Sequence, residues 1–421
     1  MLFIGVLDDV ALSNKNLSPN LIETKVLIKV VTENKFETRN IPMKPRKPDV
    51  GQSYSKNSEN ICGNEWQERY ARLHKNGLKS WKSEKKGRFL VYSCKKKECK
   101  GGYGNRMRAL ASLFYLAILT DRVFLIDWET PTSLDKYLET ERISWNYRLG
   151  ETTESFRVNS WQKERFPVVR KLVAEQNMDQ YFNNTVEVVK YFISTLFKEI
   201  QQNPILRLKA IDLGFPLSIL DSHVHSMGCA FRFLFRLNHD LKEELEETSS
   251  MMGYNEHVIL SIYVRTGDLN TFRRKSNDLR LPRSKFKDVF SCARLIQFAI
   301  QKKFNTTNIA WFLATDSWDL KNYAELRYPH TRQYRGLIEH IEISTLKNRK
   351  DALHDPRNPP GDGMRTIMLE LYLMAKSDFY LHFGGSFGDA ASALALAPSS
   401  YYGTLKKPSF KCIMPKILRD T

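Results

Sequence analysis

The spacing of hydrophobic positions predicts alternating strands and helices in the second half of the chain. A continuous apolar run, rich in β-branched residues, predicts a buried strand at 257–264, and further strands are expected at 308–316, 338–344 and 378–383. Helices are expected between them at 284–303, 318–328 and 364–376, and a turn followed by a small-residue helix is expected across 384–397. This alternation predicts a parallel sheet covered on both faces, and such sheets bind ligands at the carboxyl ends of their strands.

The first half contains one comparable unit. An alternating run predicts a strand at 88–93, a glycine-rich turn follows at 100–104, and an Ala- and Leu-rich helix is expected at 107–120. A strand, a glycine turn and a helix can direct backbone N–H groups at an anion. No Gly-Lys-Ser/Thr follows Gly104, and Met107 stands where a dinucleotide fingerprint needs glycine, so neither an ATPase nor an NAD enzyme fits.

The remainder of the chain predicts the domain organisation. Residues 1–60 are polar and broken by prolines, which predicts a flexible stem or tail. Helix is expected at 64–81 and across the charged stretch 156–250, with 186–201 as its strongest helix. We therefore expect an N-terminal α/β domain with a helical insertion at 61–250, on the acceptor side, and a C-terminal Rossmann-like domain at 255–421.

Polar side chains gather at the predicted strand ends. Arg265 follows one strand, Asp316 and Ser317 follow the next, and a Gly-Gly-Ser-Phe-Gly turn at 384–388 follows the last. Arginine can hold a pyrophosphate through two hydrogen bonds, a helix N-terminus offers N–H donors, and an acid can read a base edge. The set suits a nucleoside diphosphate, although a glycine turn by itself more often only closes a βα unit.

Composition narrows the partners and the compartment. The 421 residues carry 65 Lys and Arg against 47 Asp and Glu, a net charge of +18 that suits an anionic partner or a solvated basic surface. A nucleic-acid binder would interleave aromatic and basic residues on an exposed sheet, a pattern that the sequence does not contain. The six cysteines are too scattered for a zinc site, and sequons at Asn16, Asn183 and Asn305 suit a secreted or luminal glycoprotein. The apolar stretch at the start is too short to span a membrane, so the chain is either soluble or given without an N-terminal anchor.

Four segments resemble the motifs of the eukaryotic GDP-fucose-dependent fucosyltransferases. "GGYGNR" is similar to the first motif of the enzymes that include the plant xyloglucan α1,2-fucosyltransferase, and "YVRTGD" to the His-x-Arg-Arg-Gly-Asp signature that protein O-fucosyltransferases share. "FLATDSWDLKNYAELRYP" and "SDFYLHFGGSFGDAA" resemble blocks of the core α1,6-fucosyltransferase. The four segments occur in the family's order between residues 88 and 400.

The resemblance implies a GT-B-like fold, two Rossmann-like α/β domains that face a central cleft. It implies inverting, metal-independent transfer of L-fucose from GDP-fucose to a hydroxyl of a glycan or glycoprotein, with no cofactor, in the Golgi or secretory lumen. Nucleic acid is not an expected partner, and a membrane would be reached only through an anchor. The alternative is a fucosyltransferase-like binding protein without activity.

The resemblance also implies roles for individual residues. Arg265 would bind the β-phosphate of GDP and act in catalysis, Ser386 and Phe387 would cradle the pyrophosphate, and Glu370 would read guanine. Asn105 and Arg106 are expected to cap the first helix and to place an amide and a guanidinium on the rim of the first domain. The expected GDP-fucose site comprises Gly102, Gly104, Asn105, Arg106, Tyr263, Arg265, Asp316, Ser317, Glu370, Ser386 and Phe387.

The chain departs from the family's pattern at three positions. Tyr263 replaces the histidine of the signature, Thr266 replaces its second arginine, and Arg273 stands where the α1,6 enzymes have an acid. No general base is therefore identified. Asp127 and Glu129 are the candidates because they follow the "VFLI" strand of the first domain.

Other ionisable residues are expected to be structural. Asp268 is expected to hold the loop after Arg265. A satisfied structural role is expected for His223, His225 and His382.

Overall fold

The structure is a computed structural model that describes residues 61–418 with internal gaps. The gaps are 96–98, 100, 151–155, 160, 162–165, 191–194, 267–282, 339–361, 384, 397–399, 402–411 and 413–417. The expected stem at 1–60, the loop residues Asp268 and Arg273, and most of the strand expected at 338–344 therefore lie outside the described residues.

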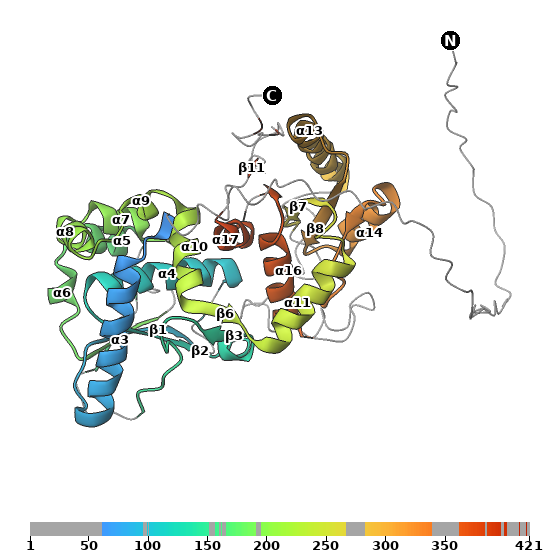
Figure 1. Cartoon of the computed structure of the whole chain (residues 1–421). Coiled ribbons are helices and arrows are strands. Elements are labelled where there is room, and N and C mark those ends of the chain that lie inside the picture. The colour runs from blue at the N-terminus through green and yellow to red at the C-terminus, as the bar shows by residue number, and fades with distance from the viewer. Residues whose placement is uncertain are drawn as a thin grey trace, which may run out of the picture. The chain divides into compact units, whose positions relative to one another are not determined.

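A four-stranded parallel sheet forms the first half (Figure 1). Its strand order is β2-β1-β5-β4, with β2 at Val123–Trp128, β1 at Phe89–Cys94, β5 at Val186–Lys190 and β4 at Phe156–Asn159. The helices of this half are α3 Glu65–Glu84, α4 Tyr103–Leu119, α5 Phe166–Glu175, α6 Met178–Tyr181, α7 Phe197–Gln202, α8 Pro204–Asp212, α9 Ser218–Asp221 and α10 His223–Leu234. The expected strand at 88–93 and the helices at 64–81 and 107–120 are confirmed.

The helix expected at 186–201 is wrong, because its first residues form β5 and only α7 is helical. Val186 and Val189 are buried, and the β-branched run suits a strand. Glu187 gave the segment a charged, helix-like pattern, yet it is fully buried. Its carboxylate accepts hydrogen bonds from the Asn159 side-chain amide at 2.7 Å and from Asn184. β4 likewise interrupts the stretch that was expected to be helical from 156 to 250.

A second parallel sheet forms the other half. Its order is β11-β10-β7-β8-β9, with β11 at Ser400–Tyr401, β10 at Phe379–His382, β7 at Val258–Val264, β8 at Ile309–Thr315 and β9 at Thr331–Arg332. Its helices are α11 His239–Met251, α13 Phe286–Phe304, α14 Trp318–Arg327, α16 Gly363–Ala375 and α17 Ser386–Ala395, with a 3-10 turn, η3, at Arg283–Lys285. β7 and β8 are buried at every residue, as the continuous apolar runs predicted.

One apolar core contains residues of both sheets. The largest apolar cluster contains Leu90 and Phe124 of the first sheet together with Ile259, Phe312 and Tyr380 of the second. A short antiparallel pair, β3 Leu138–Thr140 with β6 Phe235–Leu237, follows the 3-10 turn η1 at Leu134–Lys136. The domain boundary between 250 and 255 stays a prediction.

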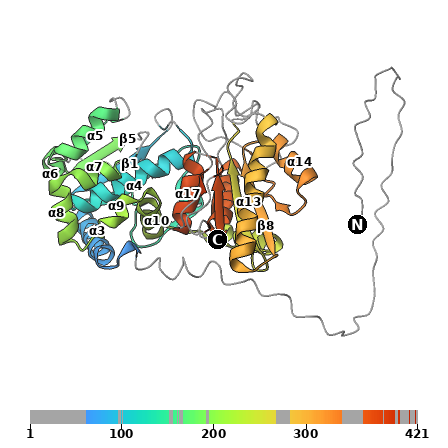
Figure 2. The same ribbon diagram turned by 90° about the horizontal axis from the view of Figure 1, so that it is seen from above.

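Helix α17 joins the two halves (Figure 2). It follows β10 of the second sheet but packs against α4 and α10 of the first half, and against α16 on its other side. Small residues make this possible, because a Cβ on Gly228 of α10 would overlap the carbonyl oxygen of Ala393 in α17. The guanidinium of Arg108, on α4, forms an ion pair with Asp389 of α17.

Three disulfides cross-link the chain, and they use all six cysteines. Cys62–Cys229 ties the start of the described chain to α10, Cys94–Cys99 closes the loop after β1, and Cys292–Cys412 ties α13 to the C-terminal segment. Disulfides persist in oxidising compartments. Among the described helices, none is both long and apolar enough to cross a membrane.

We predict that the Cys62–Cys229 disulfide stabilises the fold more than the Cys94–Cys99 disulfide does. The sequence separations are 167 and 5 residues, and loop-closure entropy corresponds to about 5 and about 2 kcal/mol. The double variant Cys62→Ala/Cys229→Ala should therefore lose more free energy of unfolding than Cys94→Ala/Cys99→Ala in denaturant titrations. Equal losses from the two pairs would contradict the prediction.

Candidate functional site

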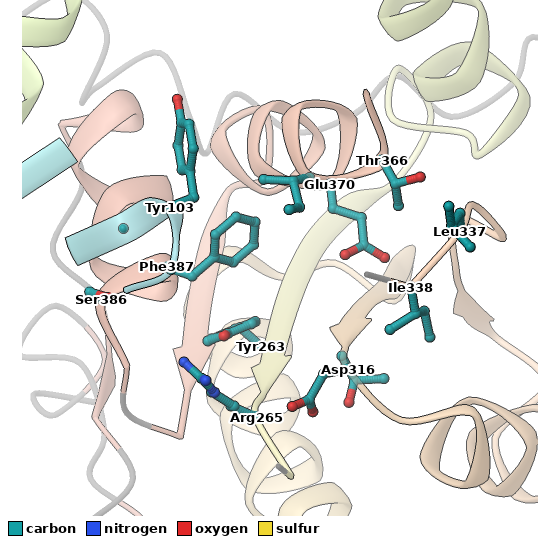
Figure 3. A pocket seen from close by; sticks show the side chains of 14 residues that line it. Tyr103, Tyr263, Arg265, Asp316, Leu337, Ile338, Thr366, Glu370, Ser386 and Phe387 are labelled. Carbon is teal, nitrogen blue, oxygen red and sulfur yellow. The ribbon is translucent and has the colours of Figure 1, made fainter. Parts of the chain in front are cut away.

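A pocket lies where α4 and α17 begin and where β7 and β8 end, and it encloses about 670 Å³ with its open mouth included. It is called the central pocket below (Figure 3). Its lining residues are Gly102, Tyr103, Gly104, Tyr263, Arg265, Thr315, Asp316, Leu337, Ile338, Thr366, Ile367, Glu370, Ser386 and Phe387. Eight of the expected donor residues are thus brought together: Gly102, Gly104, Tyr263, Arg265, Asp316, Glu370, Ser386 and Phe387.

Two helix N-termini form one wall of the central pocket. α4 begins at Tyr103 and α17 at Ser386, and their first turns touch because Gly104 has no side chain. A Cβ on Gly104 would overlap the Ser386 carbonyl and come within 2.6 Å of the Phe387 backbone nitrogen. The first N–H groups of a helix have no intrahelical partner and favour negative charge nearby. This wall therefore offers donors from two helices to an anion.

Tyr263 and Phe387 form the floor beside that wall. Their rings lie 5.3 Å apart between centroids, and a Cβ on Gly388 would come within 3.0 Å of both Tyr263 and His382. Gly385 has φ +99°, a conformation that residues with a side chain rarely adopt, and it turns the chain from β10 into α17. The aromatic residue at 263 therefore packs under the start of α17.

Arg265 extends from the end of β7 beside Tyr263, and Figure 3 shows its guanidinium pointing toward the side where Ser386 lies. Asp316, at the end of β8, accepts hydrogen bonds from the Thr266 backbone nitrogen at 2.7 Å and from the Thr266 hydroxyl at 3.0 Å. Thr266, which stands in place of the family's second arginine, thus ties the loop after β7 to the end of β8. Asp316 lines the pocket and also fixes the segment that carries Arg265.

Glu370 lies at the opposite end of the central pocket, on α16. Figure 3 shows its carboxyl group pointing into the cavity, toward the side of Asp316. Its Oε1 accepts a hydrogen bond from the Lys321 ammonium at 3.1 Å, and the same ammonium donates to the Tyr334 carbonyl at 2.6 Å. Burial raises the pKa of Glu370, the nearby Lys321 opposes the rise, and Asp316 adds to it.

Three expected donor residues lie elsewhere. Arg106 is fully buried rather than on the rim, and it donates to the carbonyls of Gly101 at 2.9 Å, Cys99 at 3.2 Å and Thr130. Ser317 is buried and caps α14 by accepting from the Leu320 backbone nitrogen at 3.3 Å. The cap of α4 is Gly102, so Asn105 neither caps this helix nor lines the central pocket.

Asp127 and Glu129 do not line the central pocket. They line, with Lys95 and Arg148, a second pocket that lies over the face of the first sheet where Val91, Leu125 and Val188 also line it. The Lys95 ammonium lies 3.0 Å from Asp127 and 3.5 Å from Glu129, and hydrogen bonding to Asp127 raises its pKa. The role of either acid as the general base stays a prediction.

The histidines expected to be structural lie outside the lining of the central pocket. Burial and the nearby Arg108 lower the pKa of His382 to about 4, and its Nε2 lies 3.5 Å from Asp389. Burial also lowers the pKa of His223 and His225. His382 is therefore neutral at physiological pH, inside the packing of α17.

The sequence did not point to Tyr103, Thr366 or the apolar pair Leu337 and Ile338, all of which line the central pocket. Tyr103 stands within the glycine turn, a position that could have been noticed. Leu337 and Ile338 follow β9 through a short irregular segment, and Ile338 was expected only as the first residue of a strand at 338–344, not as part of the site.

Comparisons with known proteins identify the fold. No protein-family model matches the chain, and no curated protein matches it. An arginine-to-lysine mutant of Arabidopsis thaliana FUT1, solved in complex with GDP, superposes with a TM-score of 0.50 and 17% identity, over 85% of this chain and 80% of that one. The chain has the GT-B fold of the GDP-fucose fucosyltransferases.

Two other solved structures are also similar at lower scores. NodZ α-1,6-fucosyltransferase co-crystallised with GDP gives a TM-score of 0.47 at 13% identity, over 75% of this chain and 94% of that one. POFUT1 in complex with GDP-fucose gives 0.36 at 9% identity, over 76% and 99%. The superposition on FUT1 confirms the fold expected from the sequence.

We predict that Gly104→Ala disturbs the central pocket. The added Cβ would force the first turns of α4 and α17 apart, so the free energy of unfolding, measured by denaturant titration, should fall by about 1–3 kcal/mol. Gly150→Ala is the control, because its Cβ would meet no atom within 4 Å and only its φ of +75° is strained. A Gly104→Ala protein that is as stable as the wild type would contradict this packing.

Proposed function

We propose that the protein transfers L-fucose from GDP-fucose to a hydroxyl group of a glycan or glycoprotein, with inversion and without a metal ion. The observation that carries the proposal is the arrangement of the central pocket. Arg265 and two helix N-termini stand at one end, and the carboxyl group of Glu370 stands at the other. The fold shared with FUT1, which was solved with GDP, supports it.

The cationic end suits a pyrophosphate. The planar guanidinium of Arg265 can donate two parallel hydrogen bonds to phosphate oxygens, and the first N–H groups of α4 and α17 can complete the cradle. Ser386 and Phe387 lie where α17 starts, so their backbone nitrogens belong to this set.

The acidic end suits guanine. A carboxylate can accept from two adjacent donors, and guanine presents N1–H and N2–H side by side, whereas adenine does not. Leu337, Ile338 and Thr366 line the same end and provide apolar surface for a flat base. Glu370 is therefore proposed to select guanine.

The chemistry follows from the charge that develops during transfer. The bond between C1 of fucose and the β-phosphate oxygen breaks, and its electron pair stays on GDP. The acceptor oxygen attacks C1 from the opposite face, and its proton passes to a general base, for which Asp127 and Glu129 remain predictions. Arg265 and the helix N-termini stabilise the growing phosphate charge, so their effect falls on the transition state.

A second candidate is a binding protein that keeps the fold without the activity. Tyr263 in place of the signature histidine favours it, as do the ion pairs that hold Asp127 and Glu129 beside Lys95. Such a protein would bind GDP-fucose without turnover. Incubation with GDP-[¹⁴C]fucose and an array of glycan and glycoprotein acceptors separates the two, because only a transferase leaves label on an acceptor.

We also propose that the protein works in the secretory lumen, as Golgi transferases do. The three disulfides suit an oxidising compartment. Asn183 and Asn305 of the sequons are exposed, which is what glycosylation requires.

We predict that Arg265→Lys loses most of the transfer activity while the protein stays folded. A lysine offers a point charge in place of the planar fork, and the loss of such a donor typically lowers kcat on the order of 10²–10³-fold. Arg265→Ala should lose nearly all activity. Steady-state kinetics should show a larger effect on kcat than on the KM for the acceptor, because the charge develops in the transition state.

Arg283→Lys is the matched control for that experiment. Arg283 is exposed, pairs with Asp319 on the surface and lies outside the lining of the central pocket, so its activity should match the wild type. A folded Arg265→Ala protein that keeps activity within a few-fold of wild type would disprove the site.

We predict that chelators leave the transfer reaction unchanged. The proposed charge neutralisation comes from Arg265 and helix N-termini, which EDTA does not remove. Within the described part of the chain, no group of three or more His, Cys, Asp or Glu residues is arranged to hold a metal ion. Activity that disappears in EDTA and returns with Mn²⁺ or Mg²⁺ would rule out the metal-independent mechanism.

A further inference from the structure

Lys321 is a fully buried lysine next to the central pocket. It lies on α14, and its side chain has no exposed surface. Its ammonium donates to the Tyr334 carbonyl at 2.6 Å and to Glu370 Oε1 at 3.1 Å, and it lies 5.4 Å from the centroid of the Trp318 ring. The positive charge is thus held by one carbonyl, one carboxylate and one aromatic face.

A buried ion pair is a costly way to hold two elements together. Removing two charges from water costs several kcal/mol per ion, and well-packed apolar residues of the same size often stabilise a fold as well or better. Glu370 is also not enclosed, since its carboxyl group reaches the cavity. The pair is therefore better explained by its effect on the charge and orientation of the Glu370 carboxyl group, which a ligand in the pocket would contact.

We propose that Lys321 is a positioning residue that keeps Glu370 ionised and fixes its orientation, so that the pocket selects a base with two adjacent N–H donors. This inference rests on the proposed function, because it assumes that Glu370 faces the base of the donor nucleotide. Lys321 engages Oε1 from behind and so limits rotation of the carboxyl group. A carboxylate held in this way accepts from both donors of guanine, whereas a protonated acid would present an O–H to one of them.

The groups around Glu370 make Lys321 the decisive charge among the described residues. Burial raises the pKa of Glu370, and Asp316 at the end of β8 raises it further. Tyr334 faces the pair from the segment after β9, and its hydroxyl donates to Glu244 of α11 at 2.9 Å. Lys321 of α14 is the cation that opposes these effects. Without it, Glu370 should take up a proton at a higher pH than in the wild type.

The test measures nucleotide affinity against pH in Lys321→Met. Calorimetry with GDP, IDP and ADP from pH 5.5 to 8.5 gives the ratio of GDP affinity to ADP affinity, which cancels the titration of the terminal phosphate that all three nucleotides carry. This ratio should change less with pH in the wild type than in the variant. In Lys321→Met the pKa of Glu370 rises, so GDP binding should weaken by about tenfold for each unit of pH by which the solution lies below the new pKa. The affinity should recover as the pH is raised above that pKa. IDP, which lacks N2–H, should lose less than GDP, and ADP should not change.

Glu370→Gln separates positioning from packing. In this background residue 370 cannot titrate, so adding Lys321→Met should cause no further pH dependence. With GDP-fucose, Lys321→Met should raise the KM for the donor more than it lowers kcat, because the base lies far from the bond that breaks. Lys376→Met is the matched control. Lys376 pairs with Glu246 at 2.6 Å outside the pocket, and its variant should bind all three nucleotides as the wild type does.

The outcomes distinguish this inference from the proposed function. A wild-type protein that does not bind GDP would refute the proposed function itself. A wild type that binds GDP, with a Lys321→Met variant that shows the same pH profile, would overturn the role of Lys321 alone. An equal loss for GDP and ADP at every pH would show a merely structural role and would also overturn it. Where Lys321→Met does not fold, Lys321→Gln is used instead, because it retains N–H donors for Tyr334 and Glu370 without the charge. The pH dependence of its nucleotide affinity then tests the role of Lys321 in the same way.

Discussion

The close approach of α17 to α4 and α10 is the constraint on which the site depends. It requires glycine at 104 and 228, where a Cβ would overlap the backbone of α17, and it is reinforced by the ion pair between Arg108 and Asp389. Because α17 leaves the second sheet directly after β10, this contact joins the two sheets through one core. The same contact brings the N-termini of α4 and α17 together. The packing that joins the two halves therefore also forms the proposed phosphate cradle.

The electrostatics of the central pocket follow from this geometry. Strands β7 and β8 end at its base and deliver Arg265 and Asp316, while α16 carries Glu370 at the far end. The end proposed to bind the phosphates and the end proposed to bind the base are thus set by different elements. The hydrogen bonds from Thr266 to Asp316 fix the loop after β7 to the end of β8. They therefore hold the neighbouring Arg265 in its position in the pocket. The overall positive charge of the chain adds a general attraction for an anionic donor, but the position of the anion depends on these few groups.

The sequence predicted the strands and helices whose hydrophobic residues follow a clear pattern. Buried strands such as β7 and β8 and the small-residue helix α17 were expected close to their observed bounds, and the residues at their ends were therefore expected to meet. Prediction was wrong for β5, where the buried Glu187 carboxylate accepts hydrogen bonds from two asparagines, Asn159 and Asn184, that no sequence pattern links to it. It also missed Lys321, since a lysine on a helix is normally exposed, and only the structure shows that this one is buried and donates to Tyr334 and Glu370.

Arg106 and Arg265 show why a motif does not by itself give a role. Both follow glycine-rich or strand-end segments, and both were expected to meet the donor, yet Arg106 donates to the carbonyls of Cys99, Gly101 and Thr130 and lies 5.2 Å from the centroid of the Trp128 ring. With the Cys94–Cys99 disulfide, it locks the turn that precedes α4. Its guanidinium therefore acts on the backbone, holding Gly102, Tyr103 and Gly104 so that the helix itself faces the pocket. The glycine-rich turn holds the start of α4 at the central pocket. In the proposed site, the cation that meets the phosphate is Arg265, which comes from the other sheet.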